Sequence, residues 1–399
     1  MERRAPQRMR ITLIGSMPPA RGVSAYTASL AGALALRDDV DLDVLSFRSL
    51  YPKLLYPGGA PDARSDTGID NTLPVRRSLT WWNPVGWIAA GFRLRGDIVH
   101  AQWWSFFLAP AYAAVLAVAR LRGKRVVLTV HNTEPHERGL LRRVANRAVL
   151  PFAHCIIVHA LANARSLTAG RAAASVAIVP IGIAAQSRTP RDRADARAAL
   201  GLPAHAPLVL FCGHIRGYKG VDVLFEAFSQ VADRLPDAQL LVAGQLWRDA
   251  AVTEARADEL AARLGGRVHA RFRYLTGEEL HDCYSAADLV VFPYRRFDAQ
   301  SAAASDALAY GRAIVVTDVG GLPELVDDPA AVVPPSDARA LAEAITRALT
   351  DATLRARLED GAARRARSRS WDAIADATVA VYASLHGGAR RTELQGGDA

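Results

Sequence analysis

Two basic side chains three residues apart, Arg216 and Lys219, have the chemistry and the spacing that a diphosphate needs. They lie in the segment GHIRGYKG, which follows the apolar run Leu208 to Cys212 and precedes an expected helix from about Val221. Cations beside a helix N-terminus attract phosphates and neutralise the charge that grows on a departing diphosphate. We therefore predict a diphosphate-binding turn here, with a solvated basic turn as the alternative.

The segment Phe297 to Glu324 combines two carboxylates with a run of small residues. An apolar strand is expected to end before it, and a helix and a second strand follow within it. Asp298 and Asp306 can accept hydrogen bonds from sugar hydroxyls. Backbone N–H groups at the start of the helix can approach a phosphate, and these belong to Ser301, Ala302 and Ala303.

A histidine placed directly after a buried strand is a further candidate. His131 follows the apolar run Arg125 to Val130. The carboxyl ends of parallel strands form the ligand edge of a sheet, where an imidazole can exchange hydrogen bonds with a substrate hydroxyl. A structural role at the strand end is the alternative. His136 and Glu137, one turn further on, can serve the same site or face water, and the sequence leaves both open.

Gly22 lies in a loop between an expected strand, Arg10 to Gly15, and an expected helix from about Val23 to Leu36. A strand, a glycine loop and a helix in this order can hold a phosphate, although the full G-x-G-x-x-G spacing is absent. A tight turn before a core helix is an equal alternative.

The acidic run Asp39 to Asp43 has the D-x-D pattern with which some transferases hold a divalent ion. Its carboxylates alternate with aliphatic side chains, and this period of two is typical of a strand that exposes one face to water. We therefore predict a strand here and no metal site.

Strand and helix patterns alternate along both halves of the chain, which predicts an α/β fold with two doubly wound sheets. We expect an N-terminal domain over residues 1–185, a linker over 186–206 without a continuous apolar run, and a second domain over 207–370. An amphipathic helix over 371–386 and a disordered tail over 387–399 follow. Residues Leu50 to Leu79 are expected to form a long loop that leads to Trp81 and Trp82, a pair that can meet lipid or an apolar acceptor.

The composition narrows the classes of partner. The net charge of +9 favours anionic partners, but the arginines are spread along the chain, so no nucleic acid partner is expected. The three cysteines, Cys155, Cys212 and Cys283, are expected to be buried thiols in a reducing compartment. The apolar run Ile11 to Ile14 is too short for a secretion signal, which favours a cytoplasmic protein. The apolar segment Trp103 to Ala119 is shorter than a membrane span and is expected to form a buried or interfacial helix.

Together these motifs resemble glycosyltransferase family 4, whose members are retaining enzymes of the GT-B architecture. The resemblance rests on the Gly22 loop, VVLTVHN, VPIG, GHIRGYKG and the stretch that ends in TDVGGLPE, and it covers nearly the whole chain. It implies an acceptor domain and a donor domain that face each other across a cleft, with residues from Trp371 onward crossing back onto the first domain.

The resemblance also implies roles for single residues. Gly22 would approach the donor diphosphate, and Arg216 and Lys219 would hold it. His131 and Asp298 would contact the transferred sugar as the catalytic pair, while Asp306 would bind the ribose. The family usually carries Glu where this chain has Asp298 and Asp306, a glycine-rich loop where it has residues 300–304, and often a polar residue where it has Ile181.

The implied activity is metal-independent, cofactor-free transfer of a hexose from a nucleoside diphosphate sugar to an acceptor hydroxyl. The acceptor is expected to be a glycan, polysaccharide or lipid-linked precursor, with peripheral contact at the inner membrane face. The alternative is a nucleotide-sugar-binding protein of the same fold that is catalytically weakened by its shortened acids. An epimerase or phosphorylase of this shape is disfavoured because it would need a different acid/base set or a cofactor lysine.

Overall fold

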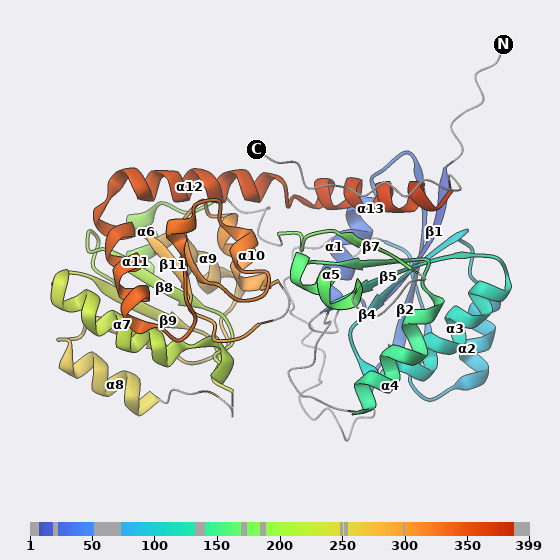
Figure 1. Cartoon of the computed structure of the whole chain (residues 1–399), viewed down its shortest axis with the longest axis horizontal. Coiled ribbons are helices and arrows are strands. Elements are labelled where there is room, and N and C mark those ends of the chain that lie inside the picture. The colour runs from blue at the N-terminus through green and yellow to red at the C-terminus, as the bar shows by residue number, and fades with distance from the viewer. Residues whose placement is uncertain are drawn as a thin grey trace, which may run out of the picture.

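The structure, a computed structural model, describes residues 8–18, 23–51, 73–131, 140–168, 174–183, 189–247, 250, 254–297 and 300–386, without the side chains of residues 140–143, 166, 168 and 386. These residues form two parallel β-sheets, each covered by helices (Figure 1). The predicted α/β fold with two doubly wound sheets is confirmed. Gly22, His136, Glu137 and Asp298 lie outside the described residues.

The first sheet has the strand order β3-β2-β1-β4-β5-β6-β7 within the described residues, with all neighbouring strands parallel. Its central strand β4 is buried on both faces, as expected in the middle of a parallel sheet, and this burial includes its polar residues His100 and Gln102. The strands are β1 (Met9–Ile14), β2 (Val40–Ser49), β3 (Val75–Thr80), β4 (Ile98–Trp103), β5 (Arg125–Val130), β6 (Cys155–Val158) and β7 (Ser175–Ile178).

Two apolar layers cover the faces of the first sheet. One layer is formed with α1 (Val23–Ala35) and α13 (Trp371–His386), so the last helix of the chain packs on the first sheet. The other is formed with α2 (Pro84–Phe92), α3 (Ala109–Leu121) and α4 (Leu140–Val149). Where the structure describes the chain, the remaining helical segments here are η2 (Phe106–Leu108), η3 (Leu150–Phe152) and α5 (Leu161–Thr168).

The second sheet has the order β10-β9-β8-β11-β12-β13, again with parallel neighbours. Its strands are β8 (Leu208–Cys212), β9 (Gln239–Ala243), β10 (Val268–Arg271), β11 (Leu289–Phe292), β12 (Ala313–Thr317) and β13 (Val332–Val333). Its helices are α6 (Arg193–Ala199), η5 (Gly217–Lys219), α7 (Val221–Arg234), α8 (Glu254–Arg263), α9 (Gly277–Ala286), α10 (Ala302–Leu308), η6 (Pro323–Leu325), η7 (Pro329–Ala331), α11 (Ala338–Thr350) and α12 (Ala352–Arg367).

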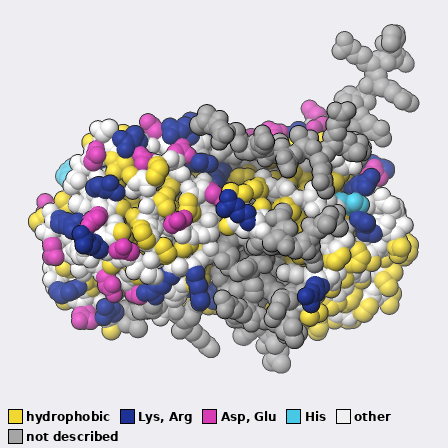
Figure 2. Space-filling model, viewed as in Figure 1, with side chains coloured by type: hydrophobic (Ala, Val, Ile, Leu, Met, Phe, Trp, Pro, Cys, Tyr) yellow, Lys and Arg dark blue, Asp and Glu magenta, His cyan; other side chains and the backbone are white. Residues whose placement is uncertain are grey.

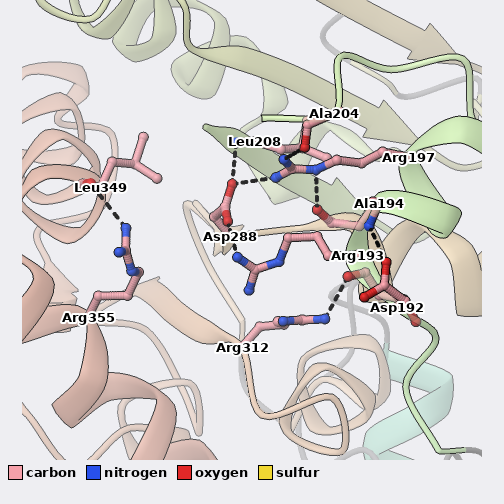
Figure 3. A network of polar contacts seen from close by, with 12 residues as sticks. Asp192, Arg193, Ala194, Arg197, Ala204, Leu208, Asp288, Arg312, Leu349 and Arg355 are labelled. Atoms are coloured by element: carbon pink, nitrogen blue, oxygen red, sulfur yellow. Dashed lines mark hydrogen bonds and ion pairs between the residues drawn. The ribbon is translucent and has the colours of Figure 1, made fainter. Parts of the chain in front are cut away.

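Helix α6 lies in the segment that the sequence predicts as a linker, yet it packs into the core of the second sheet through Ala196 and Leu200. Buried Asp288, at the start of β11, anchors it (Figure 3). The carboxylate accepts hydrogen bonds from Arg193 at 2.7 Å, from Arg197 at 2.6 Å and from the backbone N–H of Leu208 at 2.7 Å. Arg197 also donates to the carbonyl oxygens of Ala204 and Ala286.

The prediction of a loop from Leu50 to Leu79 is wrong for its last residues, because β3 begins at Val75 and pairs with β2. The acidic run before Val44 behaves as the predicted strand. Asp43 accepts hydrogen bonds from Arg76 on the neighbouring strand and from Thr12 at 3.2 Å, so its carboxylate serves pairing between strands.

The apolar segment around α3 forms a buried helix, and no helix among the described residues is long and apolar enough to cross a membrane. Trp103 is buried and donates to Asn146 at 2.8 Å, so its side chain is not available to lipid. Trp82 instead is 60% exposed. The three cysteines are buried thiols, as predicted.

Candidate functional site

The basic turn predicted from GHIRGYKG lies between β8 and α7, with η5 inside it. Gly220 closes the turn in the left-handed conformation, with φ of 66°, and a Cβ here would lie 2.0 Å from the carbonyl oxygen of Pro293. The backbone N–H of Arg295 donates to the carbonyl oxygen of Tyr218 at 2.8 Å. The turn is therefore pressed against the segment that leaves β11, and only glycine permits this approach.

Lys219 is a buried cation, with 8% of its surface exposed. Its ammonium lies 5.2 Å from the centre of the Tyr294 ring, a favourable cation–π distance. Burial lowers the pKa of Lys219, and nearby Arg216 lowers it further, although Tyr218 and Cys212 oppose this shift. No ion pair within the described residues includes Lys219. Burial disfavours the charged form of Lys219, and an anion bound beside the ammonium would stabilise that form.

The start of α10 lies beside Lys219. A Cβ placed on Gly213 would be 3.4 Å from both the Cβ of Ala303 and the Nζ of Lys219. Gly213 therefore lies between Ala303 and Lys219. Ser301 caps α10, accepting from the N–H of Ala304 at 3.4 Å, and exchanges a hydrogen bond with the hydroxyl of Tyr294 at 2.9 Å. The structure thus brings Ser301, Ala302 and Ala303 to the basic turn, although they are far from it in sequence.

Arg216 belongs to the same turn, and its guanidinium lies 4.6 Å from the centre of the Trp247 ring. Stacking on an indole holds the planar guanidinium in place. Asp306 is partly buried on α10. Burial raises the pKa of Tyr284, and the charge of Asp306 is among the further causes, so this carboxylate lies near the tyrosine that donates to the carbonyl oxygen of Ala303 at 3.0 Å.

His131 lies at the carboxyl end of β5, as predicted, and forms part of a buried histidine network with His100, Gln102 and His159. Its Nε2 lies 2.8 Å from the side-chain amide of Gln102, and its Nδ1 lies 3.1 Å from Nε2 of His159. Tyr26, from α1, contacts the His131 ring edge-on at 4.8 Å between centroids.

Burial keeps the histidine network neutral. It lowers the pKa of His100 to about 3 and that of His159 to about 4. The pKa of His131 lies well below its ordinary value, first because of burial and then because of the two neighbouring histidines.

The proton positions in this network follow from its fixed end. Nδ1 of His159 faces the carbonyl oxygen of Val179 at 2.9 Å and must donate, so its Nε2 accepts from Nδ1 of His131. Nε2 of His131 then accepts from Gln102. Rotating the side-chain amide of Gln102 by a half-turn exchanges the positions of its oxygen and its NH₂. Because Nε2 of His131 needs a donor, the NH₂ of Gln102 faces His131 and its oxygen faces His100. This series of hydrogen bonds ends at Tyr382, on α13, which donates to Nδ1 of His100 at 2.6 Å.

Gln102 and His159 were missed from the sequence, although His159 carries the same signal as His131, a polar residue directly after a buried strand. Gln102 carries no such signal because it lies inside β4. Both engage the ring nitrogens of His131, so a sugar hydroxyl at Nε2 would share this atom with Gln102 or displace it.

Gln300 and Glu324, in the unit of the second sheet, make hydrogen bonds to the unit of the first sheet. The side-chain oxygen of Gln300 accepts from the N–H of Ile181 at 2.9 Å and from Arg369 at 3.0 Å. Glu324 accepts from the N–H of Leu161, at the start of α5, at 2.8 Å. Ile181 therefore contacts Gln300 through its backbone N–H. This contact does not need the polar side chain that the family often has at this position.

Two protein-family models match the chain. The model described as Glycosyltransferase Family 4 matches residues 20–187, and the model described as Glycosyl transferases group 1 matches residues 192–365. A D-inositol 3-phosphate glycosyltransferase of Saccharomonospora viridis is 30% identical over 321 residues, which cover 75% of this chain and 72% of that relative. A second, from Streptomyces bingchenggensis, is 36% identical over 224 residues, which cover 54% of this chain but only 49% of the relative's length.

Solved structures show the same fold. Sucrose-phosphate synthase from Thermosynechococcus elongatus has a TM-score of 0.68 at 24% identity and covers 96% of this chain and 100% of its own. Anabaena HepE, in a crystal structure in complex with UDP and glucose, has a TM-score of 0.70 at 19% identity, with coverage of 95% and 100%.

Proposed function

This chain belongs to glycosyltransferase family 4 and has the GT-B fold, and from this premise we propose that it moves a hexose from a nucleoside diphosphate sugar to an acceptor hydroxyl. The observation that carries the proposal is the convergence of Arg216, Lys219 and the start of α10, where Gly213 leaves room between Lys219 and Ala303. A buried cation beside the start of a helix is suited to a diphosphate.

In the proposed reaction, the diphosphate of the donor binds at Arg216 and Lys219. The bond between the sugar's anomeric carbon and the diphosphate breaks, and both electrons leave with the diphosphate. The two cations stabilise the negative charge that develops there, which supplies the charge that a metal ion provides in other transferases. Removal of divalent ions with a chelator is therefore expected to leave the rate unchanged.

The acceptor hydroxyl attacks the face that the diphosphate leaves, so the configuration at the anomeric carbon is retained. Its proton passes to a diphosphate oxygen as the new glycosidic bond forms. Neutral His131, whose Nε2 accepts a hydrogen bond in the histidine network, is positioned to accept one from a sugar hydroxyl instead. In this proposal Asp298 contacts the donor sugar, Asp306 contacts the ribose, and Gly22 approaches the diphosphate.

The donor and acceptor classes are part of the proposal. The structure of HepE in complex with UDP and glucose supports UDP-glucose as the first donor to screen. We propose a lipid-linked, glycolipid or polysaccharide precursor as acceptor, met by a cytoplasmic protein that contacts the inner membrane face. Because curated relatives are named D-inositol 3-phosphate glycosyltransferases, this water-soluble acceptor belongs in the same screen.

The first test is a donor screen with release of nucleoside diphosphate as the readout, followed by calorimetry on two variants. Lys219→Ala and Arg216→Ala should each weaken donor binding by about 1.5–3 kcal/mol, because each removes a charge-assisted hydrogen bond. The matched control is Arg234→Ala, an exposed base at the far end of α7, which should change binding by less than about 0.5 kcal/mol.

Two outcomes would contradict the proposal in different ways. Unchanged donor affinity in both variants would refute the assignment of the basic turn. Donor binding without transfer or hydrolysis for any acceptor would favour the second candidate, a nucleotide-sugar-binding protein weakened by Asp at positions 298 and 306.

A further inference from the structure

Helix α2 presents an apolar face to solvent. Its exposed side chains Val85, Ile88 and Phe92 follow helical spacing and are 77%, 48% and 61% exposed. Trp82, directly before the helix, is 60% exposed, and Leu121, at the end of α3, is 86% exposed. We call these five residues the α2 face. Figure 2 shows hydrophobic side chains gathered at this end of the molecule, where Figure 1 places α2 and α3.

The α2 face cannot turn inward, because the opposite side of α2 is already packed. Gly91 lies so close to α3 that a Cβ on it would be 2.6 Å from the Cβ of Val118. Arg122 donates to the carbonyl oxygens of Gly91 and Leu94, both at 3.2 Å, and Trp87 donates to that of Thr80 at 2.5 Å. These contacts fix α2 on α3, so the apolar side chains remain at the surface.

The chain around this face is strongly basic. Between Trp81 and Arg125 there is one acidic residue, Asp97, which is paired with Arg10 at 2.9 Å. Against this one acid the same stretch carries six basic residues, a local excess of five positive charges, and these are Arg93, Arg95, Arg120, Arg122, Lys124 and Arg125. Arg93 and Arg95 are exposed directly after α2.

We propose that the α2 face docks on an anionic lipid bilayer. An apolar helix face with an interfacial tryptophan and flanking arginines has the properties of a segment that lies in the headgroup region. The arginines would pair with anionic headgroups as the apolar side chains enter the acyl boundary. A second copy of this chain fits less well, because it would bring two basic surfaces together.

Docking would place the bilayer against helix α2, whose first turn lies at the edge of the sheet that carries the proposed acceptor side. Helix α2 starts where β3 ends, and the carboxyl ends of the parallel strands, including the end of β5 at His131, lie along one edge of the sheet. This link to a lipid-borne acceptor rests on the proposed function, whereas the docking itself does not.

Flotation of the full chain with vesicles tests the proposal. Wild type should float with vesicles of phosphatidylcholine and phosphatidylglycerol, and much less with phosphatidylcholine alone. The double variant Val85→Asp with Phe92→Asp should lower the bound fraction about tenfold or more, because charged groups oppose burial among acyl chains. Arg93→Gln with Arg95→Gln should lower the affinity by roughly fivefold per arginine.

Matched controls isolate the α2 face. Leu36→Asp replaces an 85% exposed leucine at the end of α1 and should float as wild type does, as should Arg234→Gln. Circular dichroism and thermal unfolding confirm that each variant is folded. Unaltered flotation of Val85→Asp with Phe92→Asp, or no flotation of wild type, would refute the proposal.

Light scattering without vesicles tests the rival occupant. A wild-type dimer that the aspartate substitutions convert to a monomer would assign the α2 face to a second copy and refute bilayer docking. Donor turnover with the screened acceptors is scored separately. Intact flotation without any turnover would contradict the proposed transferase activity alone. Turnover without flotation would contradict the docking and the proposed membrane contact, but not the transferase activity.

Discussion

At the scale of single residues, the histidine network shows how burial sets chemistry at His131. Removing three imidazoles from water disfavours their charged forms, so His100, His131 and His159 remain neutral at pH 7. A neutral imidazole must offer one donor and one acceptor. The fixed acceptor at the carbonyl oxygen of Val179 therefore sets the direction of every hydrogen bond back to Gln102.

The same burial predicts a loss of stability in mild acid. In the unfolded chain each histidine takes up a proton below its ordinary pKa of about 6.5, but folded His159 resists protonation until its pKa of about 4. The contribution of His159 to stability should therefore fall as the pH drops from about 6.5 to about 4, by about 1.4 kcal/mol at pH 5.5. Urea unfolding at a series of pH values from 7.5 to 4.5 measures this change in the free energy of unfolding.

A variant separates this effect from general acid sensitivity. His159→Gln should reduce the acid dependence, since it removes one buried proton acceptor while keeping a polar side chain. His205→Gln, at an exposed position, should leave the dependence unchanged. An identical dependence in wild type and His159→Gln would refute the explanation.

At the scale of elements, helix α6 shows how a short polar segment becomes part of a domain core. Its side chains include several charges and few large apolar groups, so its pattern does not predict a buried element. Asp192 caps the helix, accepting from the N–H of Ala194 at 2.8 Å. Arg197, only 3% exposed, then joins α6 to the carboxylate of Asp288 (Figure 3).

Substitution of Asp288 tests this anchor. Asp288→Ala should destabilise the second unit by about 3–5 kcal/mol, because Arg197 remains buried without its counter-ion. The control is Glu343→Ala, which removes an exposed ion pair with Arg339 and should cost less than about 1 kcal/mol. Chemical denaturation followed by circular dichroism measures both. Equal effects in the two variants would show that the Asp288 carboxylate does not anchor α6.

At the scale of the whole molecule, the chain passes from the second sheet back to the first between α12 and α13, which lie end to end across the top of Figure 1. Arg369 lies at this passage, is 3% exposed, and donates to the side chain of Gln300 and to the carbonyl oxygen of Glu324. Its own carbonyl oxygen accepts from the N–H of Ile183 at 3.0 Å. The passage is thereby tied to both units and to the segment that follows β7.

The bond from Leu161 to Glu324 should be visible in amide exchange. Glu324→Ala removes the carboxylate that accepts from the N–H of Leu161, so exchange at the start of α5 should accelerate about 2- to 10-fold, consistent with one lost hydrogen bond. Asp360→Ala, which removes an exposed carboxylate on α12, should not change exchange there. Unchanged exchange in Glu324→Ala would refute a persistent contact between the two units at this point.

The sequence by itself determined the elements whose apolar pattern is long and regular. The strands Arg125 to Val130 and Leu208 to Cys212 have the boundaries that their patterns predict. Buried parallel strands are continuous apolar runs, so their ends are marked where the run stops. For the same reason His131 and the turn with Arg216 and Lys219 could be placed at the ends of strands.

Only the tertiary structure decided which distant residues meet. That Ala303 lies one glycine away from Lys219, that Gln102 and His159 engage His131, and that Tyr382 closes the histidine network are consequences of how strands and helices pack. Trp103 and Trp82 are the same residue type in similar apolar surroundings, yet one is buried against Asn146 and the other faces solvent. Sequence patterns record the periodicity of one segment, whereas contacts between segments depend on the packing of the whole chain.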